Sequence, residues 1–488
     1  MVKRVVRDGL GRNDMTASLT RRLRSRVSLW LGAVRNSAMA RTAIVTGLLT
    51  VLCKGIGFAK ELLVAAEFGA GATLDSYLIA LVLPTMVCNV FALSFASALV
   101  MQYLKNKTNF GEEAARERYS TSMFWGIMFV VTVAVISVML GPVLLPWLSP
   151  GFRPNLRAET QHLLWLLFPY SVLTGISTIW SSILCARGRF VASAISPGVI
   201  SLGLIIMVSV WRVPDARVLV AGLTIGAFVD VLILGICLRH DGLPLRPHVR
   251  SWQPEDQWIV SQMLPMIVAA SVRSSSAMID QSMVSMLGEG SVSELNYGSR
   301  FVVMAQGLVI LPTGKILFPH FVQLVESRKW KSLKGLLRRS VQVMFVISVP
   351  MTIILLGFSG PLVQWTFQRG QFTYAMTDRV SAVQMMYALQ FPFYLWGVLL
   401  ARMAVAMRLR RIILWGGALN LLVNIAMNYL LMKPLGVKGI ALSTAIVCLG
   451  SACYFSTAIH WALRRNIRDQ EAKEDSSSEP KATSRCLT

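Results

Sequence analysis

The sequence predicts an all-α polytopic membrane protein of about twelve transmembrane helices, in two six-helix pseudo-symmetric halves around a central cavity. Of its 488 residues, 54% are hydrophobic and only 15% are charged. The apolar residues come in blocks of about twenty or more, which is the length that spans a bilayer core. Runs such as MFWGIMFVVTVAVISVML at residues 123–140 have no polar face, so a soluble helical core is the weaker interpretation.

The apolar blocks, and the polar or Gly/Pro breaks between them, place each expected span. The span centres lie near residues 55, 88, 132, 172, 201, 229, 275, 308, 351, 392, 422 and 450.

Three pairs of motifs recur in the same order about 220 residues apart, which indicates an internal repeat. GAGATLDSY from Gly69 resembles GEGSVSELNY from Gly288, GPVLLPWLSPGF from Gly141 resembles GPLVQWTFQRGQF from Gly360, and FPY at Phe168 matches FPF at Phe391. Because each copy has an even number of spans, both copies enter the membrane from the same side. Parallel halves of this kind usually enclose a central cavity.

Basic residues in alternate loops predict the orientation. One set of loops holds about eighteen lysines and arginines and the other about eight, so the first set is expected to face the cytoplasm, together with both termini. The expected organisation is a basic interfacial segment at 1–41, a first half at 42–240, a cytoplasmic linker at 241–257, a second half at 258–465 and a disordered cytoplasmic tail at 466–488. The basic segment predicts contact with anionic phospholipids.

Charged residues inside the expected spans are the main functional signal. Lys54 lies about fourteen residues, or about 21 Å of helix, before the outer end of the first span, and Lys60 lies nearer that end. A central lysine costs at least about 2.5–3.5 kcal/mol against lipid, so such residues normally face water or a partner. Arg273 lies near the middle of span seven and Arg300 opens span eight. Together these four cations predict a positive cavity that binds an anionic substrate.

Three acidic residues, Glu61, Asp75 and Asp280, are candidates for gating or coupling. The alternative for each charge is a structural ion pair: Arg273 with Asp280, or Lys60 with a carboxylate on a neighbouring helix. Asp230 in span six is either a proton or cation site or a buried polar contact.

Several functional classes have no support in the sequence. There is no GxxxxGK[ST] loop, no metal-ligand cluster and no nucleophile with a base, so we expect no enzyme and no cofactor. The seven cysteines show no CxxC pair. The net charge of +24 lies mainly in loops and the N-terminal segment, which indicates membrane orientation rather than nucleic acid.

The stretches KGIGFAKELLVAAEFGAGATLDSY, LNYGSRF, GKILFP and SGPLVQWTFQRGQFT resemble the MviN/MurJ family of lipid II flippases, within the multidrug/oligosaccharidyl-lipid/polysaccharide exporter superfamily. The resemblance runs from about residue 43 to 464. It implies a V-shaped transporter of the bacterial inner membrane that carries an undecaprenyl-pyrophosphate-linked sugar to the outer leaflet. The family's cavity arginines of span one fall on Lys54 and Lys60, its aspartate on Asp75 and its span-eight arginine on Arg300.

The chain departs from the family pattern in span two, where Cys88 and Asn89 replace an Arg-Arg pair and LSFAS replaces E-G-A-F-S. The substrate is therefore open between lipid II and an exopolysaccharide or O-antigen repeat unit, with a glycan polymerase and glycosyltransferases as expected partners. The alternatives are a cation-coupled drug or small-molecule exporter of the same superfamily, and a non-transporting scaffold of a glycan-synthesis complex.

Overall fold

A computed structural model describes residues 38–211, 213–244, 257–312 and 317–478, and all regular structure in these ranges is helical. Residues 1–37 of the predicted interfacial segment and residues 245–256 of the predicted linker lie outside the described residues. Within the described residues, the first half contains nine α-helices and one π-helical turn, and the second half follows it along the chain. The first-half elements are α2 (Ala38–Phe68), α3 (Ala72–Ala80), α4 (Val82–Met86), η1 (Val87–Ala92), α5 (Leu93–Met139), α6 (Gly141–Leu148), α7 (Pro154–Leu166), α8 (Phe168–Ala186), α9 (Phe190–Val210) and α10 (Ala216–His240).

The second half repeats this order of long and short helices. Its elements are α11 (Gln257–Ser285), α12 (Ser291–Pro312), α13 (Phe318–Glu326), α14 (Trp330–Gly357), α15 (Ser359–Phe367), α16 (Tyr374–Ala388), α17 (Phe391–Ala406), α18 (Arg410–Leu435) and α19 (Val437–Ser478). The short pair α6 and α7 corresponds to the short pair α15 and α16, and Phe168 and Phe391 open the helices that follow. The predicted repeat is therefore present as two copies of one helical unit.

Every predicted span centre falls within a helix, and the chain is a multi-pass membrane protein. Seven described helical segments are long and apolar enough to cross a membrane, or eight if the bent pair α16 and α17 counts as one span. One of the seven, Ala72–Met139, covers two predicted spans. The three predicted spans that fail this test are α2, α11 and α12, which carry all the charged residues singled out above except Asp75 and Asp230.

α5 consists of two helices that meet at Gly111, whose φ of 85° is not helical, so the break expected between spans two and three is present as a kink. One boundary differs from the sequence prediction. The prediction of a disordered tail is wrong for residues 466–478, which extend α19. Residues 468–474 of this part (RDQEAKE) are rich in Glu, Lys, Arg and Gln, which are good helix formers, and they continue a helix that is already nucleated in the membrane.

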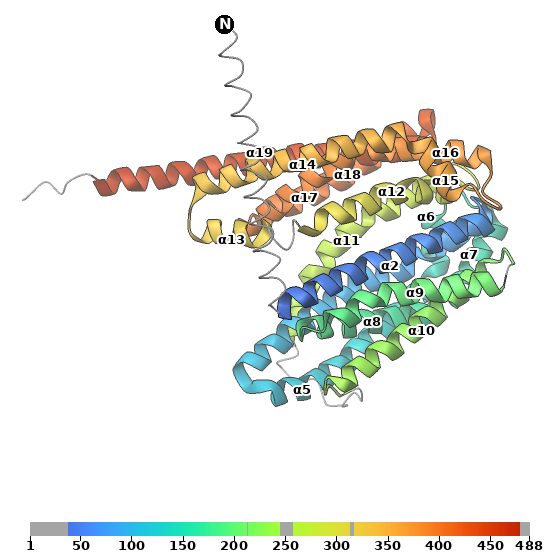
Figure 1. Cartoon of the computed structure of the whole chain (residues 1–488), viewed down its shortest axis with the longest axis horizontal. Coiled ribbons are helices and arrows are strands. Elements are labelled where there is room, and N and C mark those ends of the chain that lie inside the picture. Colours follow the sequence, from blue (N-terminus) through green and yellow to red (C-terminus); the bar gives the residue numbers. More distant parts are fainter. Residues whose placement is uncertain (1–37, 212, 245–256, 313–316, 479–488) are drawn as a thin grey trace, which may run out of the picture.

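In Figure 1 the first-half helices α2, α5, α8, α9 and α10 lie below and the second-half helices α12, α14, α17, α18 and α19 lie above, with α11 of the second half between the two groups. Within the first half, α9 and α10 pack backbone to backbone, because a Cβ added at Gly226 would lie 2.6 Å from the carbonyl oxygen of Ile200. The halves meet where α6, α7, α15 and α16 gather, at the right of Figure 1. One hydrophobic cluster there joins Val64 and Leu74 of the first half to Phe367 and Phe372 of the second.

Candidate functional site

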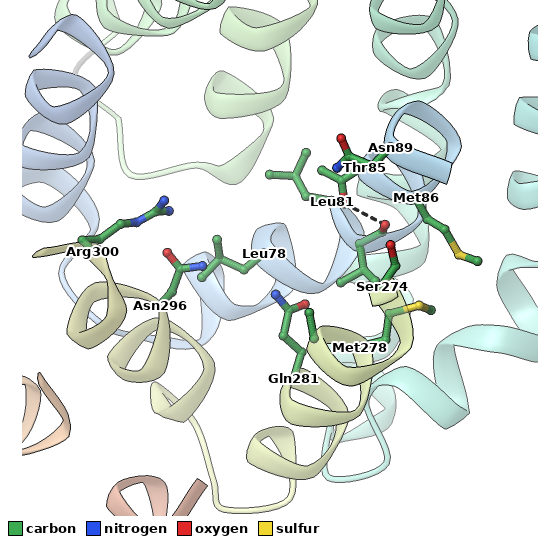
Figure 2. Close-up of a pocket in the computed structure, with 12 residues that line it drawn as sticks. Leu78, Leu81, Thr85, Met86, Asn89, Ser274, Met278, Gln281, Asn296 and Arg300 are labelled. Atoms are coloured by element: carbon green, nitrogen blue, oxygen red, sulfur yellow. Dashed lines mark hydrogen bonds between the residues drawn. The ribbon is translucent and has the colours of Figure 1, made fainter. Parts of the chain in front are cut away.

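A cavity of about 290 Å³ lies between the halves. Its walls come from α3, α4 and η1 of the first half and from α11 and α12 of the second (Figure 2). The polar side chains that line it are Thr85, Asn89, Ser274, Gln281, Asn296 and Arg300. The predicted central cavity is therefore present, and most of its polar groups are uncharged.

A charged cluster borders this cavity. The Lys60 ammonium lies 2.8 Å from the Glu61 carboxylate, and the Arg300 guanidinium lies 3.1 Å from the same Glu61 oxygen. Arg300 and Asn296 line both the central cavity and a smaller one of about 50 Å³ that contains the cluster. The structure thus brings together three predicted site residues, and the Glu61 charge offsets one of the two cations. The predicted partner of Lys60 on a neighbouring helix is instead the next residue in the chain.

Lys54 and Arg273 differ from this cluster. Both side chains are exposed, and neither forms an ion pair with any residue in the described ranges. The Lys54 ammonium reaches across to the second half, where it would lie 3.5 Å from a Cβ added at Gly307 of α12. Arg273 acts electrostatically on the Tyr394 phenol together with Arg402. Arg402 lies within the predicted tenth span and is not among the predicted site residues, although its charge in an apolar block marks it as a candidate.

Asp75 is fully buried and joins the two halves. Its carboxylate accepts hydrogen bonds from the backbone N–H groups of Gly290, at 2.6 Å, and Ser293, at 2.8 Å, and from the Ser293 hydroxyl. These groups open α12, so an aspartate of the first half caps a helix of the second. An anion at a helix N-terminus also interacts favourably with the helix dipole.

Further contacts close the same end of the molecule. The Ser282 hydroxyl donates to the Trp147 carbonyl at 2.6 Å, and the backbone N–H of Gln371 donates to the Ala66 carbonyl at 2.7 Å. Gly370 permits this approach, since its φ is 56° and an added Cβ would lie 2.2 Å from the Ala66 oxygen. We refer to these inter-half contacts, with those of Asp75, as the Asp75 closure.

Asp280 does not pair with Arg273, so that alternative is wrong. Its carboxylate accepts hydrogen bonds from Asn428 at 2.7 Å and Asn424 at 3.0 Å, both on α18. Ser443 of α19 donates in turn to Asn428. Asp280 therefore belongs to a polar cluster inside the second half, among neutral partners.

Asp230 is a buried polar contact, one of the two alternatives for this residue. It is 1% exposed and accepts hydrogen bonds from Ser196, at 2.7 Å, and from Ser177. Both partners are neutral and belong to the first half, away from the central cavity. The structure gives no contact between Asp230 and any charged site residue among those it describes.

A second charged network lies at the ends of α8 and α10 in the first half, and the sequence analysis did not identify it. Arg187 forms ion pairs with Glu112 and Asp241, and Arg189 lies 2.9 Å from Asp241. Burial raises the pKa of Asp241, but the hydrogen bonds from Arg187 and Arg189 outweigh it, so the pKa lies below its ordinary value. This network joins helix ends of the first half only, and so it cannot close the cavity.

The chain matches the family described as "Lipid II flippase MurJ" over residues 64–472. The probable lipid II flippase MurJ of Rickettsia prowazekii is 24% identical over 429 residues, which cover 86% of this chain and 84% of the relative. The corresponding Synechocystis protein is 25% identical over 447 residues, covering 88% and 82%. A lipid II flippase MurJ of Burkholderia cenocepacia is 26% identical over 354 residues, covering 68% and 67%.

Solved structures share the fold. A lipid II flippase MurJ in an inward closed conformation superposes with a TM-score of 0.74 at 20% identity, covering 86% of this chain and 87% of the other. An inward-facing multidrug resistance MATE family transporter of the MOP superfamily superposes with a TM-score of 0.69 at 13% identity, covering 87% and 99%.

Proposed function

Because the chain belongs to the lipid II flippase MurJ family, which consists of transporters rather than enzymes, we propose that it carries an undecaprenyl-pyrophosphate-linked glycan from the inner to the outer leaflet of the bacterial inner membrane. The observation that carries this proposal is the presence of Lys54 and Arg273, two membrane cations without an ion-pair partner in the described structure. A pyrophosphate supplies the missing negative charge. Lipid II is the substrate that the relatives favour, and an exopolysaccharide or O-antigen unit is the alternative.

The cations divide into two roles in this proposal. Lys54 and Arg273 bind the pyrophosphate in the state described here. Lys60 and Arg300 are held by Glu61, and they become substrate ligands when the Glu61 pairing rearranges during the cycle. Lysine carries the charge as a compact group, without the planar fork with which arginine binds phosphate oxygens, so Lys54 contributes charge more than geometry.

Alternating access requires that the Asp75 closure opens. Asp75 and Glu61 hold the two halves together at one end, because their partners lie on α12 of the other half. From the loop charges we infer that this end faces outward and that both termini lie in the cytoplasm. The closed end then faces outward while the cavity loads from the cytoplasmic side.

Asp280 is the proposed coupling residue. A partly buried carboxylate whose hydrogen-bond partners are neutral responds to binding of a proton or a cation, and transport driven in this way depends on pH or on a cation gradient. Membrane potential is the other source, since moving one charge through 100 mV is worth about 2.3 kcal/mol. In proteoliposomes, the Asp280→Asn variant should lose the ion dependence of transport but keep its response to potential. A variant with unchanged pH and sodium dependence would remove Asp280 from this role.

Depleting the protein tests the proposal. The expected result is accumulation of the lipid-linked glycan on the cytoplasmic leaflet, and identification of the accumulating headgroup decides between lipid II and a polysaccharide unit. Unchanged lipid intermediates with lost efflux of a cationic dye would support the drug-exporter alternative. Normal transport by purified partners alone would support the scaffold alternative. The proposed partners are anionic phospholipids, a glycan polymerase and glycosyltransferases.

A further inference from the structure

The lining of the central cavity is chemically unlike the cations that border it. Asn89, Gln281 and Asn296 reach it from three different elements, η1, α11 and α12 (Figure 2). Arg300 is the charged residue in this lining, and it lies at one edge of the view, on the opposite side from Asn89. Its guanidinium already forms an ion pair with the Glu61 carboxylate. The interior of the cavity therefore presents neutral amides.

Gln281 has an unsatisfied acceptor. Its side-chain carbonyl oxygen is buried and receives no hydrogen bond from any described residue. A buried acceptor of this kind is satisfied only when a ligand or water brings a donor. The oxygens of an ionised pyrophosphate are acceptors and carry no donor, so pyrophosphate cannot donate a hydrogen bond to this oxygen. Sugar hydroxyls and the N–H of an acetamido group can.

Asn89 reaches the cavity through an irregularity in its helix. Residues 87–92 form a π-helical turn, a feature that is frequent at functional sites. Within this turn Cys88 faces the first half, with its sulfur 3.1 Å from the Thr178 hydroxyl, whereas Asn89 is exposed at the cavity. The turn thus directs one polar amide toward the space between the halves.

From these observations we infer that the cavity is a sugar-binding subsite, in which Asn89, Gln281 and Asn296 recognise the hydroxyl and acetamido groups of an amino sugar. A volume of about 290 Å³ is at the small end of ligand pockets, so it fits one sugar unit near the pyrophosphate rather than a whole oligosaccharide. The inference rests on the proposed function. It divides the substrate between two regions: the pyrophosphate at Lys54 and Arg273, and the sugar at the three amides.

Two purified lipids separate these regions: lipid II, and undecaprenyl pyrophosphate without sugar. Binding of each to the full chain in nanodiscs is measured for the wild type and for Gln281→Leu. The variant should bind lipid II roughly tenfold more weakly, because it loses neutral hydrogen bonds to the sugar, and it should bind the sugar-free lipid as the wild type does. Lys54→Gln should weaken both lipids. The matched control is Gln262→Leu, an amide of the same helix that does not line the cavity.

Other results would contradict either the sugar subsite or the proposed function. Equal weakening of both lipids by Gln281→Leu, or weakening of neither, overturns the sugar subsite while the proposed function stands. A wild-type protein that binds neither lipid overturns the proposed function and the subsite with it. Asn89→Leu provides a second variant in case Gln281→Leu does not fold, since Asn89 is exposed at the cavity and has the same predicted selectivity for lipid II.

Discussion

Two pairs of membrane cations in this protein have similar chemistry and different surroundings. Lys60 and Arg300 share the Glu61 carboxylate across the interface between the halves. Lys54, six residues before Lys60 on the same helix, and Arg273 have no such partner in the part of the chain that the structure describes. A paired cation can stabilise the contact between two helices, whereas an unpaired one within a membrane span requires water or a ligand. The position of a cation in a span therefore does not by itself show whether it binds substrate or holds the two halves together.

The largest expected effect is at Arg273. Arg273→Gln should abolish transport in a complementation assay while the protein accumulates normally, because its partner is the substrate and not the fold. Lys438→Gln, an exposed lysine on α19, is the matched control and should complement fully. Exchange of Arg273 with Asp280 should not restore function. Rescue by this exchange would show that the two residues form an ion pair in the working protein.

Loss of the ion pairs that Lys60 and Arg300 form with Glu61 should lower the free energy of unfolding. Glu61→Gln removes the charged partner of both Lys60 and Arg300, and we expect a loss of about 2 kcal/mol, since hydrogen bonds between charged groups contribute about 1.5–3 kcal/mol. Thermal unfolding of the purified protein measures this loss. The double variant Glu61→Gln/Arg300→Gln should lose less than Glu61→Gln alone, because it no longer leaves the Arg300 charge uncompensated. Strictly additive losses would contradict the pairing.

Substitution of Asp75 should change the equilibrium between the closed and open forms of the protein. Asp75→Ala removes the cap of α12 and should shift the equilibrium toward the open form by about 1–2 kcal/mol, or about tenfold. The measurement is labelling of a cysteine introduced at Ser282, within the Asp75 closure, by an impermeant maleimide added outside the cell. Asp215→Ala is the matched control, because Asp215 caps α10 within the first half and touches no residue of the closure. Equal labelling of the two variants would contradict a role of Asp75 in closure.

The smallest effect should be at Asp230, a buried carboxylate that pairs with none of these four cations. Asp230→Asn should change the transport rate by less than about twofold, because an amide oxygen can still accept from Ser177 and Ser196. Transport measured between pH 6 and 8 should keep the wild-type profile. A flattened profile would instead assign Asp230 the proton site that the sequence left open.

The sequence predicted the fold well because long apolar blocks and a repeat are properties of the chain itself. All twelve span centres fall in helices. The motifs that begin at Gly141 and Gly360 lie at the starts of two equivalent short helices, α6 and α15. The prediction of disorder at residues 466–478 is wrong because the composition of this segment does not include the effect of the preceding helix, which nucleates the extension.

The site was less predictable, because it depends on contacts between distant parts of the chain. Charge within a span identified Lys54, Lys60, Arg273 and Arg300, but the partner of Arg300 lies on α2, far away in the sequence. The neutral amides Gln281 and Asn296 gave no comparable signal, since polar residues without charge are common in membrane helices. Only the arrangement of α11 and α12 around η1 brings them to one cavity.

Lys54 is the residue that we propose binds the pyrophosphate of the substrate. The most direct test reconstitutes the purified protein in liposomes that contain lipid II and measures, over time, the fraction of lipid II exposed on the outer leaflet. We expect Lys54→Gln to move lipid II no faster than protein-free liposomes and Lys54→Arg to retain much of the wild-type rate because the charge is kept, with both variants folded. Transport by Lys54→Gln at the wild-type rate would show that Lys54 does not bind the pyrophosphate.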